Sequence, residues 1–167
     1  MRLYYFRRRY GVSSLNANGE FDITVSITGN PGIAYFSLRL HFDKSKVEPV
    51  SVTRGGALLV GGITSNVNVA NIDFVTAVWS DADGSDANGT LYTVKFKAKE
   101  NASGIAVFNL TSHDIFDNTS TMNTVSVMLY DTEVVFSNNE EIPKTDIPAN
   151  ELPTKGVLKN VAKTHIK

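Results

Sequence analysis

The sequence of 167 residues contains no cysteine. This absence excludes disulfide frameworks, cysteine-ligated zinc, iron–sulfur clusters and thiol nucleophiles in one step. The chain also lacks any run of about eighteen apolar residues, the length that an apolar membrane-spanning helix requires. Its net charge of −1 leaves no overall basic field of the kind that attracts nucleic acid. We therefore expect neither a nucleic-acid partner nor insertion into a membrane.

The small net charge hides a division along the chain. Residues 1–10 carry four Arg and no acid, and residues 142–167 carry five Lys and two acids. Residues 11–141 hold seven basic and fifteen acidic side chains, a net charge of −8. We predict a basic N-terminal stub over residues 1–11, a folded domain over residues 12–136 and a linker or tail over residues 137–167.

The predicted tail has the composition of an extended linker. It contains Pro143, Pro148 and Pro153, separated by Lys, Asp, Glu, Thr and Asn. Because linkers join modules, we expect one monomeric module of a longer, multimodular protein. The first ten residues lack the apolar region and small-residue cleavage site of a secretory signal. We expect the export signal to lie outside this sequence.

Between residues 20 and 136, apolar and polar side chains alternate with a period of two, as in half-buried strands. Residues 33–43 are the clearest example. They place Ala34, Phe36, Leu38, Leu40 and Phe42 on one face and Tyr35, Ser37, Arg39 and His41 on the other. Residues 89–99 repeat the pattern. Clusters of Gly, Asn, Asp and Pro separate the runs, so we predict an all-β, antiparallel β-sandwich of about nine strands, with jelly-roll or immunoglobulin-like topology.

The single tryptophan, Trp79, shares the parity of Val75 and Ala77. This apolar set indicates an inward position, so we predict that Trp79 belongs to the core. A carbohydrate-binding sandwich would instead need aromatic side chains that point outward.

Several stretches of the sequence resemble a cohesin module. Residues 30–43 (NPGIAYFSLRLHFD) and 47–53 (VEPVSVT) are similar to its second and third strands. Residues 78–84 (VWSDADG) are similar to its middle strand and acidic loop, and residues 88–99 (NGTLYTVKFKAK) to the strand that follows. Asp117, Asn118 and residues 125–136 fit the last loop and strand. The similarity spans about residues 12–136.

The resemblance implies a nine-stranded jelly-roll sandwich without catalytic activity. Cohesins capture dockerin modules borne by secreted bacterial enzymes and so build cellulosome-like assemblies. The resemblance therefore implies a dockerin-bearing partner and an extracellular or cell-surface location. It implies no cofactor on this chain, since calcium in that system belongs to the dockerin.

The resemblance also implies which side chains meet the dockerin. The matching positions are Tyr35, Ser37, Arg39, Thr76, Val78, Ser80, Asp81 and Gly84. Strand parity independently places most of these side chains on the solvent face. Well-known cohesins present an Asn and an Asp where this chain has Tyr35 and Ser37. With Arg39 close by, Tyr35 favours a more apolar contact, either cation-tolerant or acid-seeking.

Residues 81–89 offer the only metal candidates, Asp81, Asp83 and Asp86. The segment departs from the EF-hand pattern, because Gly84 comes one position after the second acid and no Glu closes the loop. We therefore interpret it as a solvated acidic hairpin and expect no metal site.

Three functions from different classes remain open at this level. An enzyme is not expected, because no histidine has a partner at ligand spacing and no nucleophile motif is present. The leading prediction is a dockerin-binding module. The alternatives are a carbohydrate-binding sandwich, which would need outward aromatics beyond Tyr35, and a structural or adhesin spacer domain.

Overall fold

The computed structural model describes residues 7–12, 19–100, 102–136 and 161–165, with side chains described over 19–100 and 102–136. The described residues form ten strands: β1 Arg7–Val12, β2 Glu20–Ile27, β3 Ile33–His41, β4 Val47–Arg54, β5 Thr64–Ser65, β6 Phe74–Ser85, β7 Gly89–Ala98, β8 Gly104–Asp117, β9 Asp131–Phe136 and β10 Val161–His165. These residues contain no helix, and hence no helix that could span a membrane.

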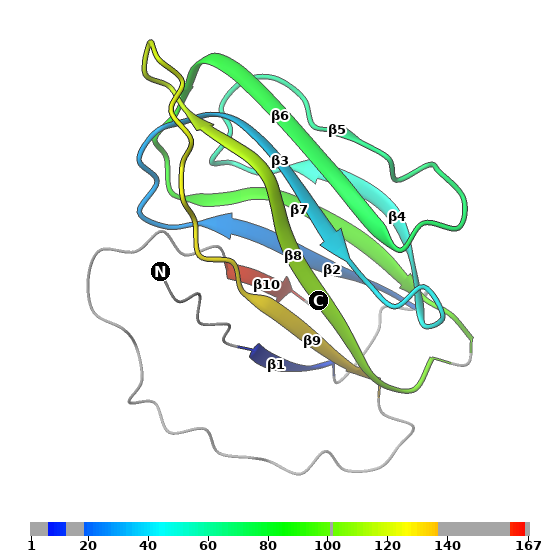
Figure 1. The fold of residues 1–167 in the computed structure, drawn as a ribbon. Helices are drawn as coiled ribbons and strands as arrows, with labels where there is room; N and C mark the ends of the chain where they lie inside the picture. Colours follow the sequence, from blue (N-terminus) through cyan, green and yellow to red (C-terminus); the bar gives the residue numbers. More distant parts are fainter. Residues whose placement is uncertain (1–6, 13–18, 101, 137–160, 166–167) are drawn as a thin grey trace, which may run out of the picture.

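The strands form two sheets that lie face to face as layers (Figure 1). One sheet has six strands in the order β1-β9-β8-β3-β6-β5, and the other has four in the order β10-β2-β7-β4. Chain neighbours such as β2 and β3 lie in different sheets, as jelly-roll topology requires. The prediction of an all-β sandwich is confirmed, with eight strands, β2 to β9, between Glu20 and Phe136 where about nine were expected.

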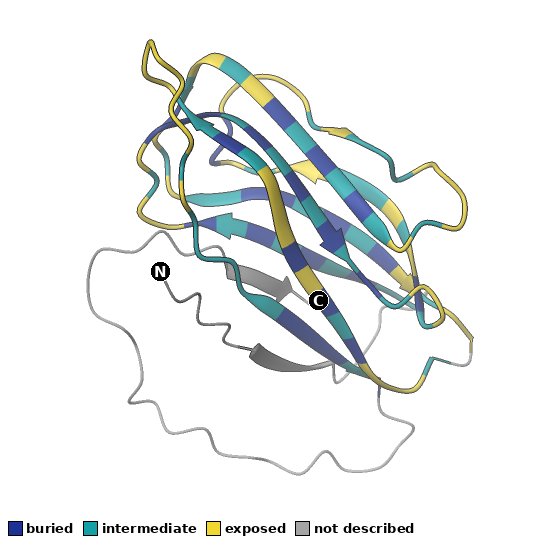
Figure 2. Cartoon of the chain, in the orientation of Figure 1, coloured by how far each residue is buried: buried dark blue, intermediate teal, exposed yellow. Residues whose placement is uncertain are grey.

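The core lies between the sheets and follows the predicted alternation. β2 alternates between half-buried and buried positions along its whole length, and β3 does so from Ala34 onward (Figure 2). The five predicted inward side chains of residues 33–43 are all buried, at 0–7% exposure. Because each inward side chain leaves water, burial of apolar surface drives the sheets together.

Aromatic rings fill one part of this core. Phe96 of β7 lies against Phe21, Phe42 and Phe108, with ring centroids 5.9, 5.1 and 5.0 Å away. Most of these contacts are edge-to-face or offset, the arrangement that ring quadrupoles favour. The four residues come from both sheets and from the chain after β3, so this cluster ties the two layers together.

Trp79 lies in the core, as predicted. Its side chain is 1% exposed and stacks with Phe36, 5.9 Å between centroids. The indole Nε1 donates a hydrogen bond to the backbone oxygen of Val60 at 2.9 Å. The ring therefore supplies both apolar packing and an anchor for the segment between β4 and β5.

The two ends of the chain depart from the prediction that they lie outside the folded domain. β1 pairs with β9 in parallel, from Arg7 opposite Asp131 to Val12 opposite Phe136, and β10 pairs with β2. β1 and β9 form the only parallel pair among the described strands. An edge strand presents a row of backbone N–H and C=O groups that an extended segment can pair with, whatever its side chains. Composition alone did not predict this pairing. Of the predicted tail over residues 137–167, residues 137–160 and 166–167 lie outside the described residues.

Candidate partner-binding face

The predicted contact residues of β3 and β6 lie directly opposite one another. Tyr35 pairs with Ser80, Ser37 with Val78, and Arg39 with Thr76. We call the outward surface of these six residues the β3–β6 face. Five of the six are half-buried and Ser80 is exposed, whereas their strand neighbours such as Leu38 and Ala77 are fully buried. Two strands far apart in sequence thus bring the predicted residues into one continuous surface.

Neighbouring strands extend the β3–β6 face on both sides. On the β8 side Tyr35 lies opposite Phe116, Ser37 opposite Asp114 and Arg39 opposite Thr111. On the β5 side Thr64 lies opposite Val78. The surface is therefore four strands wide, with β5 at its outer edge.

Aromatic rings stand at both ends of this surface. At one end the rings of Tyr35 and Phe116 are 5.7 Å apart. At the other end the guanidinium carbon of Arg39 lies 5.2 Å from the centroid of Phe74, and the ring of His41 lies 5.5 Å from the same centroid. A guanidinium over a ring is held by a cation–π attraction. This contact favours a position of Arg39 along the sheet.

Asp81 and Gly84 lie where β6 leaves the register of β3. Ser80 pairs with Tyr35, and Ser85 pairs with Ile33. Between these two pairs β6 has four residues, 81–84, whereas β3 has one, Ala34. The Asp81 Oδ1 accepts hydrogen bonds from the backbone nitrogens of Asp83 at 2.9 Å and Gly84 at 3.2 Å. Gly84 has φ of +68°, and a Cβ there would lie 2.7 Å from the oxygen of Ile33. Gly84 is required by the backbone path at the end of the face.

The three metal candidates do not converge. The Asp81 Oδ1 is engaged by backbone N–H groups, and Asp83 and Asp86 are exposed. No group of three His, Cys, Asp or Glu side chains suited to a metal ion occurs among the described residues. The loop is held by hydrogen bonds of its own, in the manner of an Asx turn.

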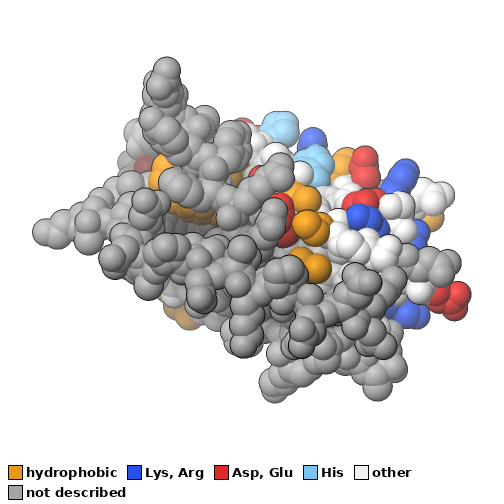
Figure 3. Space-filling model, turned by 90° about the horizontal axis from the view of Figure 1, so that it is seen from below, with side chains coloured by type: hydrophobic (Ala, Val, Ile, Leu, Met, Phe, Trp, Pro, Cys, Tyr) orange, Lys and Arg blue, Asp and Glu red, His pale blue; other side chains and the backbone are white. Residues whose placement is uncertain are grey.

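Charge on the described surface is mixed rather than of one sign. Acidic, basic and histidine side chains are interspersed on the described surface seen from below (Figure 3). On β8 the His113 Nδ1 lies 2.6 Å from the Asp114 Oδ2, and on β3 the His41 Nε2 lies 3.1 Å from the Thr111 Oγ1. The β3–β6 face thus combines an apolar centre at Val78 with polar groups around it, as protein interfaces do.

The segment after β8 is shaped by Asp117, whose carboxylate accepts four hydrogen bonds. The donors are the Thr119 hydroxyl at 2.6 Å, the Thr119 nitrogen at 3.2 Å, the Asn123 nitrogen at 2.9 Å and the Asn123 Nδ2 at 3.2 Å. The hydrogen bond from the Thr119 side chain, followed by those from Asn123, lowers the pKa of Asp117 below its usual value of 3.8. The loop projects from the end of β8 (Figure 1).

We expect Asp117→Asn to remove part of the acid sensitivity of the domain. A carboxyl whose pKa is lowered by folding stabilises the native state above about pH 4 and loses that contribution as the pH falls through the lowered value. The variant should therefore be less stable than the wild type at pH 6, and the difference should shrink at pH 3. Urea denaturation at both pH values measures this; an equal difference at both would contradict it. Asp43, whose pKa is also lowered, chiefly by Ser45, is present in both proteins.

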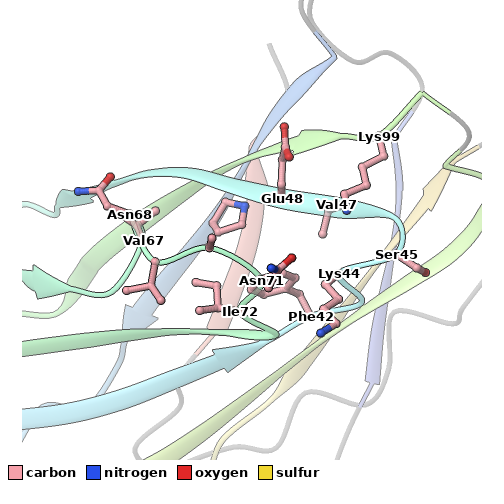
Figure 4. A pocket seen from close by; sticks show the side chains of 13 residues that line it. Phe42, Lys44, Ser45, Val47, Glu48, Val67, Asn68, Asn71, Ile72 and Lys99 are labelled. Carbon is pink, nitrogen blue, oxygen red and sulfur yellow. The ribbon is translucent and has the colours of Figure 1, made fainter.

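A separate hollow of about 610 Å³ lies between the start of β4 and the loop that joins β5 to β6 (Figure 4). Its lining includes the apolar residues Phe42, Val47 and Ile72 and the basic residues Lys44 and Lys99. None of the predicted contact residues lines it. The hollow and the β3–β6 face are therefore different parts of the molecule.

Sequence reasoning missed two aromatic residues of the surface, Phe74 and Phe116. Strand parity indicated an outward Phe74, but the resemblance carried no such position. The β8 register shifts between Ser37 and Leu38, where Asp114 and Ser112 are the partners and His113 is the extra residue. This bulge brings Phe116 onto the outer side.

The cohesin domain model matches residues 10–136, which is most of the chain. The chain belongs to the cohesin family. A search of curated proteins found no match. Cohesins are binding modules, which agrees with a continuous outward surface.

Solved cohesin structures share this fold at low sequence identity. The non-cellulosomal cohesin from the archaeon Archaeoglobus fulgidus has a TM-score of 0.62 and 17% identity, over 74% of this chain and 84% of that one. The seventh ScaB type I cohesin from Pseudobacteroides cellulosolvens has a TM-score of 0.65 and 14% identity, over 86% and 100%. The Coh-OlpC-Doc435 type I cohesin–dockerin complex from Clostridium thermocellum has values of 0.60 and 17%, over 81% and 97%. At sequence identities this low, the similarity to these structures establishes only the fold.

Proposed function

We propose that this cohesin captures the dockerin module of a secreted bacterial enzyme through its β3–β6 face. The pairing of Tyr35, Ser37 and Arg39 with the three predicted residues of β6 carries the proposal. An interface of standard size buries about 1,200–2,000 Å² in total, and a surface four strands wide offers that scale. The module is non-catalytic and acts outside the cell or at its surface, as part of a multimodular chain.

The chemistry of the face defines the partner surface. Val78 and the Tyr35–Phe116 pair can make apolar contacts with a partner. Arg39 can donate hydrogen bonds to a carboxylate or a backbone carbonyl of that partner. The partner is a dockerin that offers an acidic group opposite Arg39. Ser37 donates or accepts a hydrogen bond there without adding charge. Calcium in the complex is held by the dockerin.

We expect Tyr35→Ala and Arg39→Ala each to weaken dockerin binding by about tenfold, because Tyr and Arg side chains are enriched among the few residues that carry most of the energy of an interface. Arg39→Lys should fall between wild type and Arg39→Ala, since Lys keeps the charge but lacks the planar group that lies over Phe74. Calorimetric titration with dockerins encoded in the same genome gives the affinities.

Thr53→Ala is the matched control. Thr53 is an exposed strand residue of the other sheet, so its truncation should leave the affinity unchanged. Thermal melts must show that every variant is folded. Wild-type affinity in folded Tyr35→Ala and Arg39→Ala variants would place the interface elsewhere. Retention on a polysaccharide with no dockerin binding would favour a carbohydrate-binding sandwich instead.

A further inference from the structure

Two adjacent apolar side chains, Leu59 and Val60, point away from the core. They are 74% and 58% exposed, whereas their neighbour Leu58 is 1% exposed. Single exposed apolar side chains are common on protein surfaces, whereas contiguous exposed ones are typical of contact sites. We call Leu59 and Val60 the β4–β5 knob.

Hydrogen bonds hold the backbone of the knob on both sides. The indole Nε1 of Trp79 donates to the oxygen of Val60 at 2.9 Å, and the Nη1 of Arg54 donates to the oxygen of Gly61 at 2.8 Å. Before the knob, the nitrogen of Ala57 donates to the oxygen of Thr90 at 2.9 Å. With Leu58 buried below, the exposed pair is held in place before a partner arrives. Such preorganisation lowers the entropy that binding costs.

The knob lies at the edge of the β3–β6 face. A Cβ built on Gly61, the residue after the knob, would be 3.5 Å from the backbone oxygen of Ser80 and 3.2 Å from the Trp79 Nε1. Further along, Thr64 pairs with Val78. The segment from Val60 to Thr64 therefore runs beside β6, and the knob lies next to the Ser80 end of the β3–β6 face.

We propose that the β4–β5 knob is an apolar anchor for the dockerin and selects among dockerins. This proposal rests on the proposed function and adds a feature to the partner: an apolar depression beside the group that meets Arg39. A dockerin with a charged side chain at that place would have to leave it buried without a partner, and so would be rejected.

The test uses the whole chain with Leu59→Ser, Val60→Ser and the double substitution, titrated with the dockerin that binds the wild type best. Each single variant should bind about tenfold more weakly and the double variant weaker still, since a buried anchor loses its apolar contact. Val69→Ser is the matched control. Val69 is 57% exposed and lies at the separate hollow, so the affinity of this variant for the dockerin should stay within twofold of the wild-type value.

Each outcome decides a different point. A double variant that binds like wild type, while Arg39→Ala binds weakly, overturns the knob and leaves the proposed function standing. If the wild type binds no dockerin, both the proposed function and the proposed role of the knob are overturned. A wild type that sediments as a dimer, with a monomeric Leu59→Ser variant, would show that a second copy of this chain covers the knob and would overturn the proposal.

Discussion

Phe96→Ala is expected to cost about 3–5 kcal/mol of unfolding free energy, the range measured for deletion of a fully buried ring. Phe96 is 0% exposed, and three rings from β2, β8 and the segment after β3 surround it. These neighbours belong to both sheets and cannot all move inward, so a cavity remains. Denaturant titration measures the loss, and an unchanged slope would show that the unfolded state is unaffected.

Lys97→Ala is the matched control for this substitution. Lys97 is the next residue of β7 and is exposed, so its truncation should change the stability by about 0.5 kcal/mol or less. A loss below about 1.5 kcal/mol for Phe96→Ala would mean that the site collapses around the missing ring. The aromatic cluster would then not be what joins the layers.

Strand parity predicted the inner faces of the sandwich well, because one face of each central strand is buried and the other is wet. Leu38, Trp79 and Val94, from three different strands, are each 0–1% exposed. A slip of one residue would bury the polar set, so burial itself enforces the register. For the same reason the outward positions of Tyr35, Ser37 and Arg39 followed from the alternation.

Parity failed where the ladder is irregular. In β8 both Leu110 and Ile115 are buried, although five positions separate them. The extra residue at His113 changes the parity between these two positions, and no turn residue or glycine in the sequence announces it. The outward Phe116, and with it the aromatic pair at one end of the face, therefore could not be predicted.

The pairing of β3 with β6 could not be derived from the sequence either. These strands are joined by β4, β5 and long loops, and alternation indicates which face a residue occupies but not which strand lies beside it. The resemblance to cohesins supplied that step, and it carried no counterpart for Phe74, which lies under Arg39. The exposed knob was missed because it lies in a connection rather than in a strand.

Gly55→Ala is expected to destabilise the domain by about 2–3 kcal/mol, the scale of overpacking a site that cannot relax. A Cβ on Gly55 would overlap the carbonyl oxygen of Thr90 and lie 2.5 Å from its carbon and 2.6 Å from its Cγ2. These are backbone atoms of β7 and a side chain beside them, so the loop itself must move. That movement would strain the bonds from Gly55 to Leu91 at 2.7 Å and from Ala57 to Thr90.

Gly56→Ala provides the control at the adjacent position, where an added Cβ meets nothing within 4 Å. It should leave stability within about 0.5 kcal/mol of wild type. The two glycine variants also distinguish support of the β4–β5 knob from stability of the whole domain. Because Gly55 begins the segment that carries the knob, Gly55→Ala should weaken dockerin binding in the folded fraction, whereas Phe96→Ala should not. Equal stability of the two glycine variants would mean that Gly55 does not pack against Thr90, and the knob would lose the support proposed for it.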